Sequence, residues 1–152
     1  MNQVHEPQEW QQGEYTVSTD KSRLNIETVH TFISRDSYWA QGRKRETMER
    51  AIAHSECFGL YRGEEQVGFA RVVTDYATFA WIADVFVLPP HRGQGLAQWV
   101  IECILAHPKL QGLRRFVLAT RDAHEVYRRS GFAELEAPER WMSRIGPGYE
   151  QK

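Results

Sequence analysis

A glycine-rich turn near residue 94 has the residue types of an anion-binding site. Residues 85–97 read Val-Phe-Val-Leu-Pro-Pro-His-Arg-Gly-Gln-Gly-Leu-Ala, which predicts a strand, two prolines that end it and a turn that opens a helix. Gly93 and Gly95 carry no side chain that would keep a ligand from the backbone, and the first-turn amides of a helix beginning near Leu96 are unsatisfied donors. We therefore expect a phosphate-like anion to bind here.

The residues around this turn exclude two common nucleotide-binding loops. No Gly-Lys-Ser/Thr follows, so the lysine and hydroxyl of a Walker A loop are missing. Residues 93–98, Gly-Gln-Gly-Leu-Ala-Gln, lack the third glycine of a dinucleotide-binding fingerprint. The structural alternative is a strand-to-helix turn that needs glycines only for its geometry.

Two motifs together resemble the GNAT acetyltransferase family. The pattern Arg92-x-x-Gly95-x-Ala97 is similar to its pyrophosphate-binding signature Q/R-x-x-G-x-G/A. Residues 123–132, Ala-His-Glu-Val-Tyr-Arg-Arg-Ser-Gly-Phe, are similar to its A-x-x-x-Y-x-x-x-G-F segment. Order and separation also match, and the resemblance covers about residues 15–145.

The resemblance implies acetyl-CoA as cosubstrate. It assigns the pyrophosphate to Arg92, Gly93, Gln94, Gly95, Leu96 and Ala97. The pantetheine arm would lie between two splayed strands and pair with the backbone of Val85 and Val87, while Phe86 falls on the opposite side by strand alternation. Thr120 replaces the asparagine often found seven residues before the tyrosine, and a hydroxyl cannot reproduce both the donor and the acceptor of an amide.

The implied chemistry is acetyl transfer to an amine by direct attack in a ternary complex. Tyr127 would lie beside the CoA sulfur, and a backbone amide within residues 85–87 would bind the developing oxyanion. A phenol pKa near 10 against about 8.5 for a thiol makes full proton transfer uphill, so Tyr127 is expected to act partly as a hydrogen-bond donor. The alternative is a half-buried aromatic residue that packs on the sheet.

A candidate general base interrupts an apolar strand. Asp84 lies within residues 79–88, where burying a carboxylate costs free energy unless the group is paired with a cation or has a function. Pairing with Arg71 is the structural alternative, and the strand register decides it. Asp75 and Glu46 are further candidates, and a water chain serving a partly deprotonated amine is another possibility.

Aromatic residues beside the expected acetyl site are candidates for acceptor binding. Tyr38, Trp39 and Trp81 are predicted to line the pocket, and a nearby aspartate would suit a small cationic amine with an apolar body. The histidines show no HExxH or similar spacing, so we expect no metal site.

The elements expected to hold these residues form an α+β fold of GNAT type, a mixed twisted sheet with helices on both faces. Expected strands cover 15–18, 58–61, 67–73, 79–88, 115–119 and 141–145. One expected helix starts after Asn25, and three more cover 44–54, 96–107 and 123–130. We expect residues 1–13 to be a flexible lead-in, 14–146 the domain and 147–152 a tail.

Composition limits the possible partners. The chain has 152 residues, a formal net charge of -1 and no long basic run, which argues against nucleic-acid or anionic-membrane binding. Its two cysteines suit a reducing cytoplasm, and no secretory signal or membrane-spanning run is evident. We therefore expect a cytoplasmic monomer or homodimer that acetylates a small-molecule amine. A peptide or protein acetyltransferase and a non-catalytic acyl-CoA sensor are the alternatives.

Overall fold

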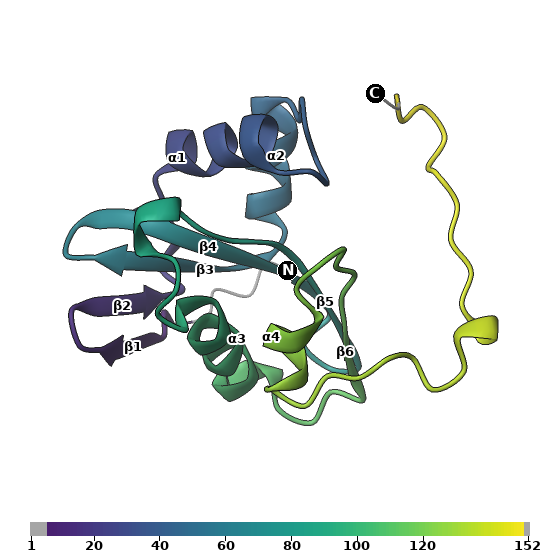
Figure 1. The fold of residues 1–152 in the computed structure, drawn as a ribbon. Helices are drawn as coiled ribbons and strands as arrows, with labels where there is room; N and C mark the ends of the chain where they lie inside the picture. The colour runs from purple at the N-terminus through teal and green to yellow at the C-terminus, as the bar shows by residue number, and fades with distance from the viewer. Residues whose placement is uncertain (1–5, 151–152) are drawn as a thin grey trace.

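A six-stranded mixed sheet organises the chain, for which the computed structural model describes residues 6–150 (Figure 1). The strands lie in sequence order: β1 (Glu9–Gln12), β2 (Tyr15–Ser18), β3 (Glu56–Arg62), β4 (Glu65–Thr74), β5 (Phe79–Val87) and β6 (Arg115–Val117). Neighbours from β1 to β5 are antiparallel, whereas β6 runs parallel to β5. The expected mixed sheet is confirmed.

Two pairs of helices cover the sheet, one pair on each face, as expected (Figure 1). α1 (Ile26–Thr31) and α2 (Arg45–Ala53) lie on one face, and α3 (Leu96–Ala106) and α4 (His124–Arg128) lie on the other. The Asn25 side chain caps α1 by accepting a 3.0 Å hydrogen bond from the Thr28 amide, as its residue type predicts. Among residues 6–150, no helix is long and apolar enough to cross a membrane.

Each face of the sheet carries its own apolar core. On the α3 face, Val100, Ile101 and Ile104 pack with residues of β3, β4 and β5. On the α1–α2 face, Phe32 stacks on Phe86 with ring centroids 4.1 Å apart. The sheet is thus buried on both sides, which holds β5 rigidly between two packed layers.

An irregularity in β5 exchanges the faces of its residues. Pairing with β4 shifts register between Phe69 and Arg71, and Asp84 on the opposing strand has a φ of 55°. Ile82 packs in the core of the α3 face, and beyond the irregularity it is Val85 and Val87 that contact this core. A bulge of this kind adds one residue to a strand and so reverses which side chains face which way.

The structure corrects two expectations at the ends of the chain. Residues 9–12, expected in the lead-in, form β1, because Gly13 at φ 60° turns the chain and Trp10 stacks 6.1 Å from Phe58. Residues 141–145, expected as a strand, are exposed and belong to no strand. Large apolar residues such as Trp141 and Ile145 suit a strand, but they do not supply the neighbour that a strand needs. Residues 1–5 and 151–152 lie outside the described residues.

Candidate functional site

A cleft opens where β5 and β6 separate. Their parallel pairing ends at Trp81 and Val117, while β5 continues to Val87. The cleft between them, here called the β5–β6 cleft, has a volume of about 470 Å³. Val85 and Thr120 line its walls with Tyr127. An open edge inside a sheet exposes backbone amides and carbonyls that a ligand can pair with.

The glycine-rich turn leads from the end of β5 to the start of α3. Gly93 and Gly95 have φ values of 82° and 76°, a conformation that other residues rarely adopt, and a Cβ on either would meet no atom within 4 Å. The backbone conformation, rather than crowding, therefore requires these glycines. The Leu96 side chain is buried in the core, so Leu96 and Ala97 can offer an anion only the amides of the first helical turn.

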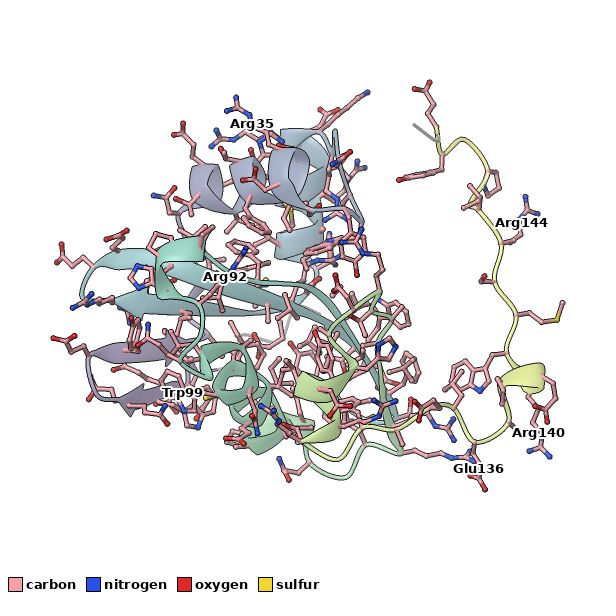
Figure 2. The ribbon with its side chains drawn as sticks, viewed as in Figure 1. Arg35, Arg92, Trp99, Glu136, Arg140 and Arg144 are labelled. Carbon is pink, nitrogen blue, oxygen red and sulfur yellow. The ribbon has the colours of Figure 1, made fainter. Side chains whose placement is uncertain are left out.

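Two side chains of this turn tie it to the sheet. Arg92 donates from Nε to the Val87 carbonyl at 2.8 Å (Figure 2). Gln94 donates from Nε2 to the Tyr15 hydroxyl at 3.3 Å and to the His91 carbonyl at 3.2 Å. Arg92 thus occupies the Val87 carbonyl, one of the groups expected to meet the pantetheine arm.

Tyr127 lies in the wall of the β5–β6 cleft. Its ring meets Phe132 edge-on at 5.9 Å, and the Phe132 amide donates to the Tyr127 carbonyl at 3.1 Å, so the Gly-Phe motif fixes the end of α4. Burial, with a smaller contribution from the nearby Tyr38, raises the pKa of Tyr127 to about 12. The phenol therefore stays protonated throughout the neutral range. Thr120 accepts from the Ala123 amide at 3.1 Å and so helps to start α4.

Asp84 is the centre of a buried ion cluster. Its Oδ2 accepts from Arg43 and from Arg71 at 2.8 Å each, and its Oδ1 accepts from the Trp39 indole at 2.8 Å. The carboxylate is 1% exposed. Burial opposes its ionisation, but the two guanidinium groups and the hydrogen bonds outweigh this and hold the pKa of Asp84 below its usual value. Such a carboxylate is a weak proton acceptor, which removes the support for Asp84 as the base.

The two other base candidates lie elsewhere. Asp75 sits in the exposed β4–β5 turn, where hydrogen bonds from Thr78, followed by those from Ala77 and Phe79, lower its pKa. Glu46 is exposed in the first turn of α2. Neither residue lines the β5–β6 cleft.

The three predicted acceptor residues do meet at the cleft. Tyr38 and Trp39 pack edge-on at 5.0 Å, and Trp81 lines the same cavity from β5. The Arg121 guanidinium lies 3.9 Å from the Tyr38 ring centre, and its amide donates to the Tyr38 hydroxyl at 2.8 Å. These contacts join the segment before α2 to the loop after β6 across the mouth of the cleft.

The family model "Acetyltransferase (GNAT) family" matches residues 26–132. The chain belongs to this family. A GNAT acetyltransferase is an acyltransferase, and the splayed strands, the glycine turn and Tyr127 are the parts that the family motifs implied.

Individual relatives agree with this GNAT assignment. The Gibberella zeae protein FG08082, named provisionally as an acetyltransferase, is 33% identical and aligns over 84% of this chain and 83% of its own. The crystal structure of xcc2953 from Xanthomonas campestris, provisionally assigned to the GNAT acetyltransferases, is 50% identical with a TM-score of 0.84, over 88% of this chain and 94% of its own. At 20% identity, N-acetylglutamate synthase from Neisseria gonorrhoeae, solved with coenzyme A and N-acetyl-glutamate, shares the fold with a TM-score of 0.65, over 83% of this chain and 31% of its own.

Sequence reasoning missed Arg43 and Arg121. Arg43 follows a glycine close to Tyr38 and Trp39, which hinted that it shares their loop, but nothing local points to a partner 41 positions away. The Arg71–Asp84 ion pair was the structural alternative to Asp84 as a general base. The observed register between β4 and β5 brings these two side chains together. Across residues 6–150, no three histidine, cysteine or acidic side chains gather as metal ligands.

Proposed function

We propose that the chain transfers the acetyl group of acetyl-CoA to the primary amine of a small molecule by direct attack in a ternary complex. One observation carries the proposal: the β5–β6 cleft brings the backbone of β5 at Val85 together with Tyr127, and β5 leads through the glycine turn into the N-terminus of α3. Acetyl-CoA supplies the acetyl group as an activated thioester. The residues present fit it, because the turn offers amides to a pyrophosphate and the split sheet offers an edge to an extended arm.

The chain's own residues have three tasks in this reaction. The α3 amides hold the anionic end, and a backbone N–H in residues 85–87 stabilises the negative charge that develops on the carbonyl oxygen. As the C–N bond forms and the C–S bond breaks, Tyr127 donates a hydrogen bond to the departing sulfur. With the pKa of Tyr127 at about 12 and a thiol near 8.5, full proton transfer would cost about 5 kcal/mol. Tyr127 therefore stabilises the thiolate while the proton stays on the phenol.

In this scheme Asp84 positions other groups. It holds Arg43, Arg71 and the Trp39 ring at the acceptor end of the cleft. The attacking amine loses its proton to water, since the carboxylate binds protons weakly in this environment.

The charge balance of the cleft favours an acceptor that carries an anionic group. Arg43 and Arg71 share a single carboxylate, and the exposed Arg121 pairs with Asp122. Three arginines thus face two aspartates, which leaves one positive charge in excess. A partly buried excess charge is stabilised by a ligand of opposite sign. This replaces the expected cationic amine with a small amine that also bears a carboxylate or phosphate.

The test measures acceptor-dependent release of CoA from acetyl-CoA with a thiol reagent near pH 8. Matched pairs of acceptors, such as phenylalanine and phenethylamine, differ only in the carboxylate. Turnover above the background without acceptor supports the transferase, and a preference for the carboxylate member supports the acceptor class. A preference for the amine that lacks the carboxylate would contradict the acceptor class alone. Activity only with peptides would contradict the small-molecule assignment, and binding of acetyl-CoA without any turnover would indicate a sensor.

A further inference from the structure

Three arginines line the β5–β6 cleft, and two of them are committed to Asp84. Arg43 and Arg71 each donate to its Oδ2 at 2.8 Å, and Arg71 also donates to the Ser55 hydroxyl at 3.1 Å. Their side chains are 20% and 14% exposed. A ligand that drew either guanidinium away would leave the buried carboxylate with one partner fewer, which is costly.

The third arginine, Arg121, is held much less tightly. Among residues 6–150 its one ion pair joins Nη2 to Asp122 Oδ2 at 3.2 Å, and both side chains are 64% exposed. An exposed pair of this kind is weak, because water competes for both charges. An anionic ligand can therefore bind Arg121 without breaking a buried contact.

The ring of Tyr38 fixes the direction of Arg121 in spite of this exposure. The guanidinium lies over the ring, 3.9 Å from its centre, and the Arg121 amide donates to the Tyr38 hydroxyl at 2.8 Å. Tyr38 in turn meets Trp39 edge-on, and the Trp39 indole is hydrogen-bonded to Asp84. A guanidinium placed over an aromatic face keeps the N–H groups at its edge available, and these groups match the two oxygens of a carboxylate.

The size of the unbalanced charge favours a carboxylate over a phosphate. The cleft holds three arginines and two aspartates, Asp84 and Asp122, so its excess is a single positive charge. A carboxylate carries one negative charge at neutral pH, whereas a phosphate monoester carries about 1.5 to 2. One carboxylate thus neutralises the cleft, and a phosphate would leave it negative.

The walls of the same cleft suit a large apolar group. Trp39 and Trp81 both line it and are 39% and 38% exposed. Indole rings offer a large apolar surface to a ligand side chain. A fitting acceptor therefore carries an amine for the thioester, a carboxylate for Arg121 and a bulky apolar side chain for the two indoles. An amino acid has these three groups.

We propose that Arg121 binds the carboxylate of the acceptor, and that the acceptor is a free amino acid with a large apolar side chain. This inference rests on the proposed transfer to an amine that bears an anionic group, and it adds the residue that selects that group. Arg121 contacts a part of the acceptor that does not react. Its loss changes which amines are used and leaves the acetyl-CoA site as it is.

Matched acceptors that differ in the carboxylate test the assignment. The kcat/KM for CoA release is compared for phenylalanine and phenethylamine, and for leucine and isopentylamine, in the natural chain and in Arg121→Gln. We expect the natural chain to prefer the amino acids about tenfold, the effect of one hydrogen bond between charged groups. The variant should lose this preference through a higher KM for the amino acids. The KM values for acetyl-CoA and for the two amines should not change.

Two further variants serve as matched controls. Arg35→Gln removes the same charge from an exposed side chain that points away from the sheet and does not line the cleft, so it should change neither KM (Figure 2). Asp122→Asn removes the carboxylate that competes for Arg121, so the KM for the amino acids should fall about twofold. A merely structural role of Arg121 would not give opposite effects on one KM in two adjacent substitutions.

Calorimetric titration of the CoA-loaded protein with the same acceptors adds a readout that needs no turnover. A preference for amino acids that survives Arg121→Gln, or an equal loss for both members of a pair, would overturn the assignment and leave the transferase intact. A natural chain that binds neither amino acid would also overturn it. Absence of CoA release with every acceptor, despite selective binding that Arg121→Gln abolishes, would instead contradict the proposed transfer alone.

Discussion

The glycine turn before α3 and the β5–β6 cleft are built in different ways. In the glycine turn, here called the backbone end of the site, the groups offered to a ligand are backbone amides, fixed by two glycines of positive φ and the first turn of a helix. In the cleft, here called the side-chain end, they are side chains held by one another, with Asp84 between Arg43 and Arg71. The backbone end tolerates changes of side chain but not of backbone conformation. The side-chain end depends on every member of its cluster. This contrast predicts which variants harm the fold and which harm only ligand binding.

Removing the charge of Asp84 should cause the largest effect. Asp84→Asn leaves two largely buried guanidinium groups without a counter-ion, which should cost about 3–5 kcal/mol of unfolding free energy, measured by urea denaturation. Asp122→Asn, an exposed aspartate at the same cleft, should cost less than about 0.5 kcal/mol. Equal losses in the two variants would show that the cluster does not hold this end together.

The same variant predicts a pH dependence. The folded pKa of Asp84 lies below its unfolded value of about 3.9, so its contribution to stability is fully present above pH 4 and is lost as pH falls through the folded pKa. The stability difference between the natural chain and Asp84→Asn should stay constant from pH 5 to 8 and narrow below about pH 4. A difference that already changes near neutral pH would mean that another group titrates with the cluster.

Tyr127→Phe tests the wall of the cleft that faces β5. Losing a hydrogen-bond donor aimed at developing charge should lower kcat by about 10²-fold. The KM for acetyl-CoA should not change, because the backbone end is intact. We also expect no fall in natural activity up to pH 10 from this residue, because its phenol has a pKa of about 12. An unchanged kcat in the variant would limit Tyr127 to packing.

Gly95→Ala should damage the backbone end alone. A Cβ at φ 76° costs about 1–2 kcal/mol, so the turn relaxes and the KM for acetyl-CoA should rise about tenfold. The acceptor KM should stay the same. Gly146→Ala is the control, because a Cβ there also meets nothing within 4 Å and no positive φ is present. A rise in the acceptor KM would show that the two ends are coupled.

The smallest effect is expected from Arg92→Ala. This variant loses one hydrogen bond, to the Val87 carbonyl, worth about 1 kcal/mol. The KM for acetyl-CoA should rise only a few-fold in steady-state assays. An increase beyond 100-fold would mean that the side chain leaves Val87 and contacts the phosphates directly.

The backbone end could be predicted from sequence because its determinants are adjacent in the chain. Gly93, Gly95 and the start of α3 lie within four residues of one another, and Tyr127 is followed by its Gly-Phe stop. The Arg43–Asp84 contact spans 41 positions, and no local pattern reports a pair that only the sheet register brings together.

The ends of the fold were less predictable for another reason. β1 is a short polar edge strand, and Glu-Trp-Gln-Gln lacks the alternation that marks a half-buried strand. Residues 141–145 contain three large apolar side chains that suit a strand, but they pair with no strand among residues 6–150. Strand propensity describes how well a side chain fits a sheet. It does not identify a neighbouring strand to pair with.

The bulge at Asp84 constrains how the family can change in length. Ile82 and Val85 pack on the same side of β5 only because one extra residue lies between their alternating positions. Deleting a single residue between 82 and 86 would turn Phe86 toward α3 and move Asp84 out of its arginine cluster. In an alignment of relatives, we therefore expect insertions and deletions to avoid this segment and to gather in the turns on either side of it.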